Sequence, residues 1–307
     1  MTELKFIPEN IVNDAVKKIT KLYKISEEKA EEFFLEEALK SRKFMEKALE
    51  FSEKKNFAKW NEYRKIMKKA RKKIYFSLRQ YKHEPEEKIN EKFAELEVKL
   101  KKEKKLSKTI SLHEELLGMH VSSKERIPFY REFYEKIFKV TGTPESVLDV
   151  SCGFNYFSVP FIKAEKLFFA GTEYKKEFVE QMDRYFSLAE KYSGIRGKGF
   201  LLDLRNTDFD TRNELLDLNN GKKFDVAFVL KLIPVMEREK KGLTENLIDI
   251  IPAEWIVLSC SKESMTKKEK ISFRETASIK KFIKENSLYV NARIDFPDEI
   301  VFVVKRE

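Results

Sequence analysis

The sequence predicts a doubly wound α/β domain with a mostly parallel sheet, preceded by an all-helical N-terminal domain. Glycine is absent from residues 1–108, and Pro8 and Pro85 are the only prolines there. After this region, short apolar runs alternate with helical stretches, the order typical of a parallel sheet covered by helices on both faces. A chain of 307 residues has room for two domains, and we expect them to span 1–108 and 109–307.

The N-terminal region contains three segments with helical patterns. Ser26 and the acids after it form an N-cap pattern, which predicts a helix to about Phe51. Over residues 57–81, apolar side chains recur at steps of three and four, which predicts a helix with one buried face. Pro85 ends or restarts this run, and a Lys/Glu-rich helix is expected to about residue 105. The apolar stripe consists of Phe57, Trp60, Tyr63, Met67, Ala70, Ile74, Leu78 and Tyr81.

All of the excess positive charge lies in this helical region. The net charge of the chain is +10, and residues 1–108 carry 30 Lys and Arg against 20 Asp and Glu. Residues 54–82 alone hold 12 basic side chains and a single acid, Glu62. A concentrated basic surface is typical of RNA binding, although a charge run can also be an ordinary solvated face. The candidate RNA-binding residues are Lys54, Lys55, Arg64, Lys65, Lys68, Lys69, Arg71, Lys72 and Arg79.

Five apolar runs after residue 108 are predicted to be strands, and acids follow several of them. The runs are Ser146–Val150, Leu167–Gly171, Phe224–Leu230, Trp255–Ser259 and Ile300–Lys305. Asp149 closes the first run, and a small-residue turn with Gly153 follows it, as expected where backbone approaches a ligand. Glu173 closes the second run 24 residues after Asp149, a spacing typical of an acid that binds ribose hydroxyls. Asp203 lies where a further strand would end, and it could also be a helix N-cap or a loop acid.

Three blocks of the second region resemble the aminoglycoside-resistance 16S ribosomal RNA methyltransferases. Residues 120–126, His-Val-Ser-Ser-Lys-Glu-Arg, are similar to the His-x-Ser-Thr-x-Glu-Arg segment of that family. Residues 149–155 are similar to its Asp-x-Ala-Cys-Gly-Leu-Asn, and residues 228–239 to its Phe-Lys-Leu-Leu-Pro-Leu-Leu-Glu motif. The blocks stand in the order of the family and cover most of 109–260.

This resemblance implies a Rossmann-like class I methyltransferase that uses S-adenosyl-L-methionine as cofactor. Arg126 would pair with the methionyl carboxylate, although alone it reads as a surface arginine. Glu173 would hold the ribose, and Asp203 with Leu204 the adenine. The methionine end would be lined by Gly153 and its neighbours Asp149, Ser151, Cys152 and Asn155. Leu230 and Lys231 would edge the pocket for the target base, with Lys231 the candidate catalytic residue or, alternatively, a solvated lysine.

The expected substrate is a base of 16S rRNA near the decoding region, methylated on guanine N7 or cytosine N4 with the small ribosomal subunit as partner. Guanine N7 exposes a lone pair and needs no general base, whereas an exocyclic amine requires a proton acceptor. The amine-methylating signature Asn-Pro-Pro-Tyr is absent, which favours N7. Residues 259–268 keep the serines and a basic residue of the family loop, with Lys262 as a candidate RNA contact, but lack its Pro and paired Gly. This altered loop argues against N7, so both atoms stay open. A tRNA base methyltransferase and a non-catalytic ribosome-assembly protein are the alternatives.

The remaining features indicate a cytoplasmic, monomeric protein without a membrane segment or a metal. Only two cysteines occur, Cys152 and Cys260, which we interpret as packed thiols in a reducing compartment. The cysteines and the three histidines never fall at metal-ligand spacing. The many Lys and Glu residues, with glutamine at only two positions, are typical of heat adaptation and predict an archaeal or thermophilic housekeeping relative of the resistance enzymes.

Overall fold

The computed structural model describes residues 7–23, 25–54, 56–80, 85–164, 166–207, 209–263 and 272–306. The chain divides into two compact units, Met1–Lys82 and His83–Glu307. The predicted boundary at residue 108 is therefore misplaced. The helix that follows Pro85 buries Phe93 and Leu96 in the same apolar core as Phe157, so it belongs to the second unit.

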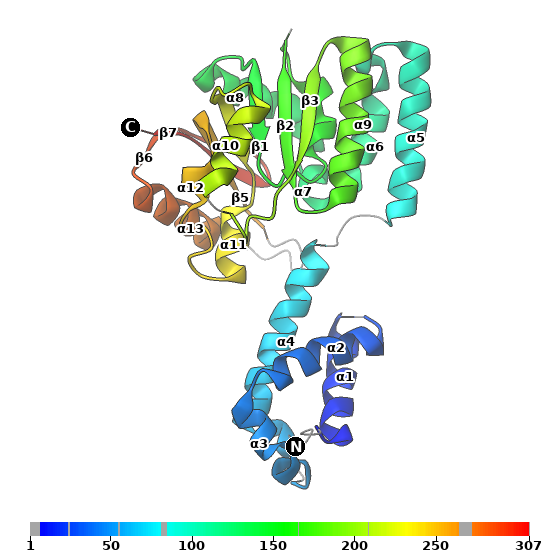
Figure 1. The fold of residues 1–307 in the computed structure, drawn as a ribbon, viewed down its shortest axis with the longest axis vertical. Helices are drawn as coiled ribbons and strands as arrows, with labels where there is room; N and C mark the ends of the chain where they lie inside the picture. Colours follow the sequence, from blue (N-terminus) through cyan, green and yellow to red (C-terminus); the bar gives the residue numbers. More distant parts are fainter. Residues whose placement is uncertain are drawn as a thin grey trace. The chain divides into compact units, whose positions relative to one another are not determined.

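The first unit is entirely helical in its described part (Figure 1). The predicted single helix from Ser26 to Phe51 is two helices, because Ser41 interrupts it and its side chain accepts a hydrogen bond from the amide of Phe44 at 3.3 Å. The predicted N-cap at Ser26 is confirmed, since its hydroxyl accepts from the amide of Lys29. The elements are α1 (Glu9–Tyr23), α2 (Glu27–Leu39), α3 (Arg42–Ser52), the 3-10 turn η1 (Phe57–Lys59) and α4 (Asn61–Gln80).

The predicted apolar stripe forms much of the core of this unit. Tyr63, Met67, Ala70 and Ile74 are buried on α4 and pack against residues of α1 and α2 such as Phe34. Phe57 and Trp60 precede α4 and are partly buried against the same core. Leu78 and Tyr81 lie outside the residues whose side chains the structure describes. Because the stripe is buried, α4 turns its basic residues outward.

The second unit is built on a seven-stranded sheet in the order β3-β2-β1-β4-β5-β7-β6. The first five strands are parallel to one another, whereas β7 runs antiparallel between β5 and β6. The carboxyl ends of β1 to β5 therefore meet at one edge of the sheet, where doubly wound folds bind ligands. The strands are β1 (Ser146–Asp149), β2 (Phe168–Glu173), β3 (Arg196–Leu201), β4 (Phe224–Val229), β5 (Ala253–Ser261), β6 (Leu288–Asp295) and β7 (Glu299–Arg306).

Helices cover both faces of this sheet (Figure 1). Val147 of β1 packs on the face of α5, α6, α8 and α9, and the adjacent Leu148 packs on the face of α10 to α13. This alternation follows from the opposite directions of successive side chains on a strand. The helices are α5 (Glu86–Glu103), α6 (Ile110–Gly118), α7 (Val121–Lys124), α8 (Tyr130–Thr141), α9 (Lys176–Ser193), α10 (Phe209–Leu218), α11 (Ile233–Glu239), α12 (Leu247–Ile250) and α13 (Ser272–Glu285), with the 3-10 turns η2 (Leu106–Thr109), η3 (Ile127–Phe129) and η4 (Asn155–Phe161).

All five predicted strands are present within two residues of their predicted ends, and the further strand expected before Asp203 is β3. The doubly wound α/β architecture is thereby confirmed. The edge strand β6 was not predicted, because exposed polar residues such as Asn291 and Arg293 interrupt its apolar pattern. Among the helices that the structure describes, none is both long enough and apolar enough to span a bilayer.

Candidate functional site

The turn that follows β1 is tied to the end of β2. The amide of Ser151 donates to the hydroxyl of Thr172 at 2.9 Å, and the amide of Cys152 donates to the carbonyl of Thr172 at 3.0 Å. The amide of Gly153 donates to Oε1 of Glu173 at 2.8 Å. Gly153 has φ +54°, and a Cβ atom there would lie 3.3 Å from the His120 ring. The turn therefore requires glycine at this position, and its backbone is held rigidly at the carboxyl edge of the sheet.

Asp149 lies beneath this turn and is buried. It accepts a hydrogen bond from Nδ2 of Asn155 at 2.7 Å, and Oδ1 of Asn155 accepts from the hydroxyl of Tyr130 at 2.9 Å. Burial raises the pKa of Asp149 to about 7, although the hydrogen bond from Asn155 and the charge of Arg126 oppose this shift. A carboxyl group with this pKa changes its protonation state near neutral pH.

Glu173 closes β2 and is also buried. Besides the amide of Gly153, it accepts from the amide of Tyr174 at 3.2 Å. Burial raises the pKa of Glu173, and these two backbone hydrogen bonds only partly offset the effect. Two buried acids thus flank the turn, as the spacing of Asp149 and Glu173 along the sequence predicts.

Asp203 and Leu204 lie after β3, at the same edge of the sheet. Asp203 is half-buried and forms a two-pronged ion pair with Arg205, at 2.7 and 2.6 Å. The hydrogen bonds from Arg205 hold the pKa of Asp203 below its ordinary value. Asp203 is not the N-cap of the next helix, which begins at Phe209. Leu204 lines a cavity of about 270 Å³ together with residues of the segment from Met236 to Leu247.

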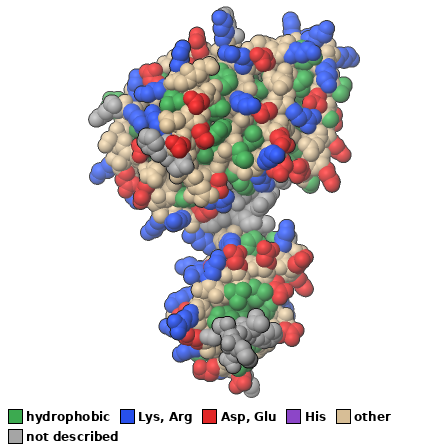
Figure 2. Space-filling model, viewed as in Figure 1, with side chains coloured by type: hydrophobic (Ala, Val, Ile, Leu, Met, Phe, Trp, Pro, Cys, Tyr) green, Lys and Arg blue, Asp and Glu red, His purple; other side chains and the backbone are tan. Residues whose placement is uncertain are grey.

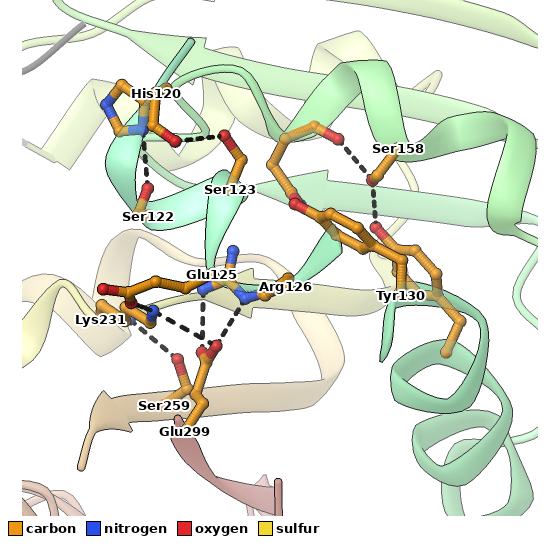
Figure 3. Close-up of polar contacts among 12 residues, drawn as sticks. His120, Ser122, Ser123, Glu125, Arg126, Tyr130, Ser158, Lys231, Ser259 and Glu299 are labelled. Atoms are coloured by element: carbon orange, nitrogen blue, oxygen red, sulfur yellow. Dashed lines mark hydrogen bonds and ion pairs between the residues drawn. The ribbon is translucent and has the colours of Figure 1, made fainter. Parts of the chain in front are cut away.

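Arg126, Lys231 and two glutamates form a buried charge cluster beside this turn (Figure 3). Arg126 donates from Nε and Nη2 to the two carboxylate oxygens of Glu299, at 2.7 and 2.8 Å. The Nζ atom of Lys231 contacts the carboxylate of Glu125 and lies 3.6 Å from Oε2 of Glu299. Both cations are at least nine-tenths buried, so neither is the surface arginine or solvated lysine that the sequence left open.

The cluster is neutral as a whole, with two cations and two carboxylates. Burial disfavours the ionised form of Glu299, but the charges of Arg126 and Lys231 outweigh this and hold its pKa below the ordinary value. Figure 3 shows the third guanidinium nitrogen of Arg126, Nη1, pointing away from Glu299. Glu299 therefore fixes the position of Arg126, and the hydroxyl of Tyr130 is a further hydrogen-bonding neighbour of the guanidinium.

Lys231 also has a constrained backbone. Its φ is +57°, a conformation that costs free energy for a residue with a side chain. The amide of Lys231 donates to the carbonyl and the hydroxyl of Ser259, at 3.1 and 2.9 Å, and these bonds hold the end of β4 against β5. The preceding residue, Leu230, is partly buried against the core of the sheet.

Sequence reasoning missed Glu299 and assigned no role to Glu125. Glu125 stands inside the block at residues 120–126, so its place beside Arg126 was a usable signal. Glu299 precedes the predicted strand at residue 300, and an acid in that place carries no local signal of burial. The structure shows its importance because β7 inserts next to β5 and brings Glu299 to the edge where Arg126 lies.

The other candidate residues lie apart from this cluster or are inert. Lys262 donates from Nζ to the carbonyl of Phe296 and lies 3.5 Å from Asp295, so its amine is turned toward the β6–β7 connection. Cys152 and Cys260 are buried. Burial raises the pKa of the Cys152 thiol well above its ordinary value and that of Cys260 to about 11, which disfavours the nucleophilic thiolate. Over the described ranges, histidine, cysteine and acidic side chains form no group of three or more that could hold a metal.

In the first unit, the basic candidates line the outer face of α4. Arg64, Lys65, Lys68, Lys69 and Lys72 are exposed there, and Arg71 is half-buried. Figure 2 shows Lys and Arg side chains gathered along one side of this unit. The ammonium of Lys54 pairs with Glu50 at 2.8 Å and lies over the ring of Phe51. Lys55 and the side chain of Arg79 lie outside the part of the chain that the structure describes.

Known proteins resemble the chain in sequence and in fold. A 16S rRNA (guanine(1405)-N(7))-methyltransferase of Frankia casuarinae is 25% identical over 196 residues, which are 62% of this chain and 62% of that protein. The chain thus matches less than two thirds of the length of this relative. An rRNA methylase from Escherichia coli has a TM-score of 0.56 at 17% identity, covering 96% of this chain and 100% of that one.

A second solved structure has the same degree of similarity. The 16S rRNA methyltransferase RmtF, in complex with S-adenosyl-L-homocysteine, has a TM-score of 0.56 at 17% identity and covers 98% of this chain and 100% of that one. At these identities the similarity establishes the Rossmann-like fold. The sequence profile described as "Ribosomal RNA methyltransferase (FmrO)" matches residues 110–287, more than half of the chain and the whole of the turn and cluster described above except Glu299. The chain therefore belongs to the ribosomal RNA methyltransferase (FmrO) family.

Proposed function

We propose that this chain transfers a methyl group from S-adenosyl-L-methionine to a base of 16S rRNA, with guanine N7 as the favoured atom. The observation that carries the proposal is the Gly153 turn, fixed by Glu173 at the carboxyl edge of a doubly wound sheet. The turn lies within the segment that matches the family profile. The names of the relatives, which are 16S rRNA guanine N7 methyltransferases, support the choice of substrate and atom.

The charges around the turn are complementary to those of S-adenosyl-L-methionine. The cofactor has a cationic ammonium and sulfonium, and Asp149 and Glu173 are buried acids at this edge. Its carboxylate is an anion, and Nη1 of Arg126 is directed away from Glu299 and can donate to it. A side chain at Gly153 would meet the His120 ring and would strain a backbone with φ +54°, so only glycine keeps the turn in this conformation. When bound, the cofactor supplies an electrophilic methyl group.

The remaining cofactor contacts are assigned from the family resemblance. Asp203 and Leu204 are proposed to bind the adenine. The Asp203 carboxylate must then bind the adenine while it stays paired with Arg205, or its ion pair with Arg205 must break. The segment from Ser151 through Cys152 to Asn155 is proposed to line the methionine end. Leu230 is proposed to border the pocket beside Lys231.

We propose that Lys231 orients the target base by hydrogen bonding. An ammonium group flanked by Glu125 and Glu299 is a donor without an acceptor lone pair, so it can bind an oxygen of the base but cannot remove a proton. Guanine presents O6 as an acceptor next to N7. Because N7 needs no proton acceptor whereas cytosine N4 does, this arrangement supports N7 methylation.

The basic face of α4 is proposed to dock on the phosphates of the small ribosomal subunit. Arg64, Lys68 and Lys69 form no ion pair with a described residue, so their charge is available to a partner. Neutralising phosphates releases counterions and gives affinity that falls with salt concentration. Alternating acids, the usual composition of a solvated helix in a charged protein, are missing here because Glu62 is the single acid of residues 54–82.

Two measurements test the proposal. Isothermal titration with S-adenosyl-L-methionine should detect binding to the wild type and none to Gly153→Arg, and the conservative variant Lys166→Arg on the same unit serves as a control. Purified small subunits and bulk tRNA should then be incubated with the protein and the cofactor, and their nucleosides analysed by mass spectrometry. We expect 7-methylguanosine in 16S rRNA. Methylation of tRNA alone, or cofactor binding without any methylation, would refute the assignment.

We also propose a housekeeping role in the cytoplasm of a heat-adapted cell, with the protein acting as a monomer. The Lys/Glu-rich composition and the changed sequence at residues 259–268 support this role over drug resistance. The part of that segment after Glu263 lies outside the described residues. A host that expresses the protein should stay susceptible to aminoglycosides, and resistance in that host would contradict the housekeeping role.

A further inference from the structure

Phe273 differs from every other phenylalanine whose side chain the structure describes. It is 90% exposed, whereas each of the others is buried or partly buried. Its neighbours in the chain, Ser272 and Arg274, are both polar. A single exposed apolar side chain is common in soluble proteins, and its position must decide whether it has a function.

The position of Phe273 is the carboxyl edge of the sheet. It is the second residue of α13, and the amide of Ser272 donates to the carbonyl of Lys262 at 3.1 Å, directly after the end of β5. The hydroxyl of Thr276, one turn further, lies 3.8 Å from Sγ of Cys260 in β5. Ser259, in the same strand, binds the backbone of Lys231. Phe273 is thus anchored to the strand end that holds the proposed base-orienting lysine.

The surroundings of Phe273 carry positive charge. The guanidinium of Arg274 is 67% exposed, and it shares the buried Glu275 with Arg238. Glu275 is therefore paired with two arginines, and these three described side chains together carry a net positive charge. An exposed aromatic ring next to arginine is the combination with which proteins bind unstacked RNA bases, the ring stacking on the base and the cation binding phosphate.

We propose that Phe273 stacks on an unpaired base of the substrate RNA next to the target nucleotide, with Arg274 binding the adjacent phosphate. This inference rests on the proposed function, since it assumes an RNA substrate at this edge. A protein partner fits less well, because a specific protein interface needs about 1,200–2,000 Å² of complementary surface and Phe273 offers one apolar side chain. Phe273 is a specificity-determining residue here, and it takes no part in the methyl transfer itself.

Steady-state methylation of purified small subunits tests the stacking. Removing one base-stacking ring should raise KM for the subunit by roughly 5- to 150-fold in Phe273→Ala, with kcat and the affinity for S-adenosyl-L-methionine unchanged. Phe273→Trp should restore KM, because indole also stacks. Tyr289→Ala, which removes a 61% exposed aromatic from the edge strand β6, is the matched control and should behave as wild type. An unchanged KM in Phe273→Ala, or an equal loss in Tyr289→Ala, would overturn the proposal.

A binding assay separates this inference from the proposed function. A single-stranded RNA oligonucleotide containing 2-aminopurine should lose fluorescence on binding the wild type and Phe273→Trp, but not on binding Phe273→Ala. Quenching that depends on Phe273 in a protein that methylates no RNA would support the stacking site and refute the enzymatic assignment. Quenching that is the same in Phe273→Ala would refute the stacking site alone.

Discussion

Replacing Glu299 by glutamine should destabilise the second unit strongly. Glu299 is fully buried and receives two hydrogen bonds from Arg126, which is itself 2% exposed. Glutamine keeps the shape but removes the charge, and its NH₂ group would face one of the guanidinium donors. Arg126 would then be a buried cation without a compensating anion, and Lys231 would lose one of its two carboxylates.

The expected destabilisation follows from the cost of leaving a buried ion unpaired. Removing one partner of a buried ion pair costs about 3–5 kcal/mol. In a domain of this size, about 1 kcal/mol lowers Tm by about 2–4 °C, so Glu299→Gln should lower Tm by roughly 6–20 °C. The matched control is Glu254→Gln on β5, whose carboxylate pairs with Lys305 at 2.6 Å on the surface. An exposed pair of this kind contributes at most about 1 kcal/mol.

Thermal unfolding followed by circular dichroism and urea titration measures both variants. A double variant, Arg126→Met with Glu299→Leu, should be more stable than Glu299→Gln because it leaves no unpaired charge. It should nevertheless fail to bind S-adenosyl-L-methionine, since Arg126 is absent. If Glu299→Gln unfolds at the same temperature as Glu254→Gln, the buried cluster does not stabilise the unit and the reasoning is wrong.

Three further predictions concern docking, pH and the domain boundary. Changing Arg64, Lys65 and Lys68 to Glu should spare cofactor binding but weaken binding to the small subunit. The slope of log K against log salt should fall by about 0.7–0.9 for each phosphate that the variant no longer neutralises. The control is the same charge reversal at Lys101, Lys102 and Lys105, at the end of α5 and just after it, and equal effects of the two triple variants would argue against docking through α4. The pKa of Asp149 is raised to about 7 in the folded protein from an ordinary value of 3.8, so the folded state holds this proton more tightly than the unfolded state. Stability from this group is present at low pH and is lost between about pH 4 and 7. Urea titrations should therefore show Asp149→Asn gaining stability over wild type across that window, and no such gain would mean that the carboxyl group titrates normally. A fragment of residues 85–307 should fold, whereas one of residues 109–307 should aggregate. The shorter fragment lacks the buried Ile89, Phe93, Leu96 and Leu100, each of which stabilises the folded state by about 1.5–3 kcal/mol. A cooperative unfolding transition in the shorter fragment would contradict the boundary after Lys82.

The sequence predicted the parallel strands well because their apolar runs are continuous and buried on both faces. Val226 to Val229, for example, pack alternately on the two helical layers, so all four positions are apolar. The motif residues Asp149, Gly153 and Glu173 were also placed correctly at one edge of the sheet, because parallel strand ends coincide there. Their roles toward the cofactor remain predictions.

Two features escaped prediction for physical reasons. The division of the chain after Lys82 depends on which core α5 joins, and its Lys/Glu-rich surface resembles that of the preceding helices, so composition alone pointed to residue 108. The ion pair between Arg126 and Glu299 joins positions 173 residues apart. Neither residue differs locally from a surface residue, and only the insertion of β7 beside β5 determines their burial.

The late position of Glu299 also matters for how the protein is made. Arg126 leaves the ribosome 173 residues before its partner, and during that interval its guanidinium has no carboxylate from β7 to bind. The helical unit up to Lys82 can fold as soon as it emerges, since it contacts its own core. The second unit instead matures only when β7 enters the sheet between β5 and β6. A chain that stops before Glu299 would therefore retain the three family-like blocks and still lack the anion that holds Arg126.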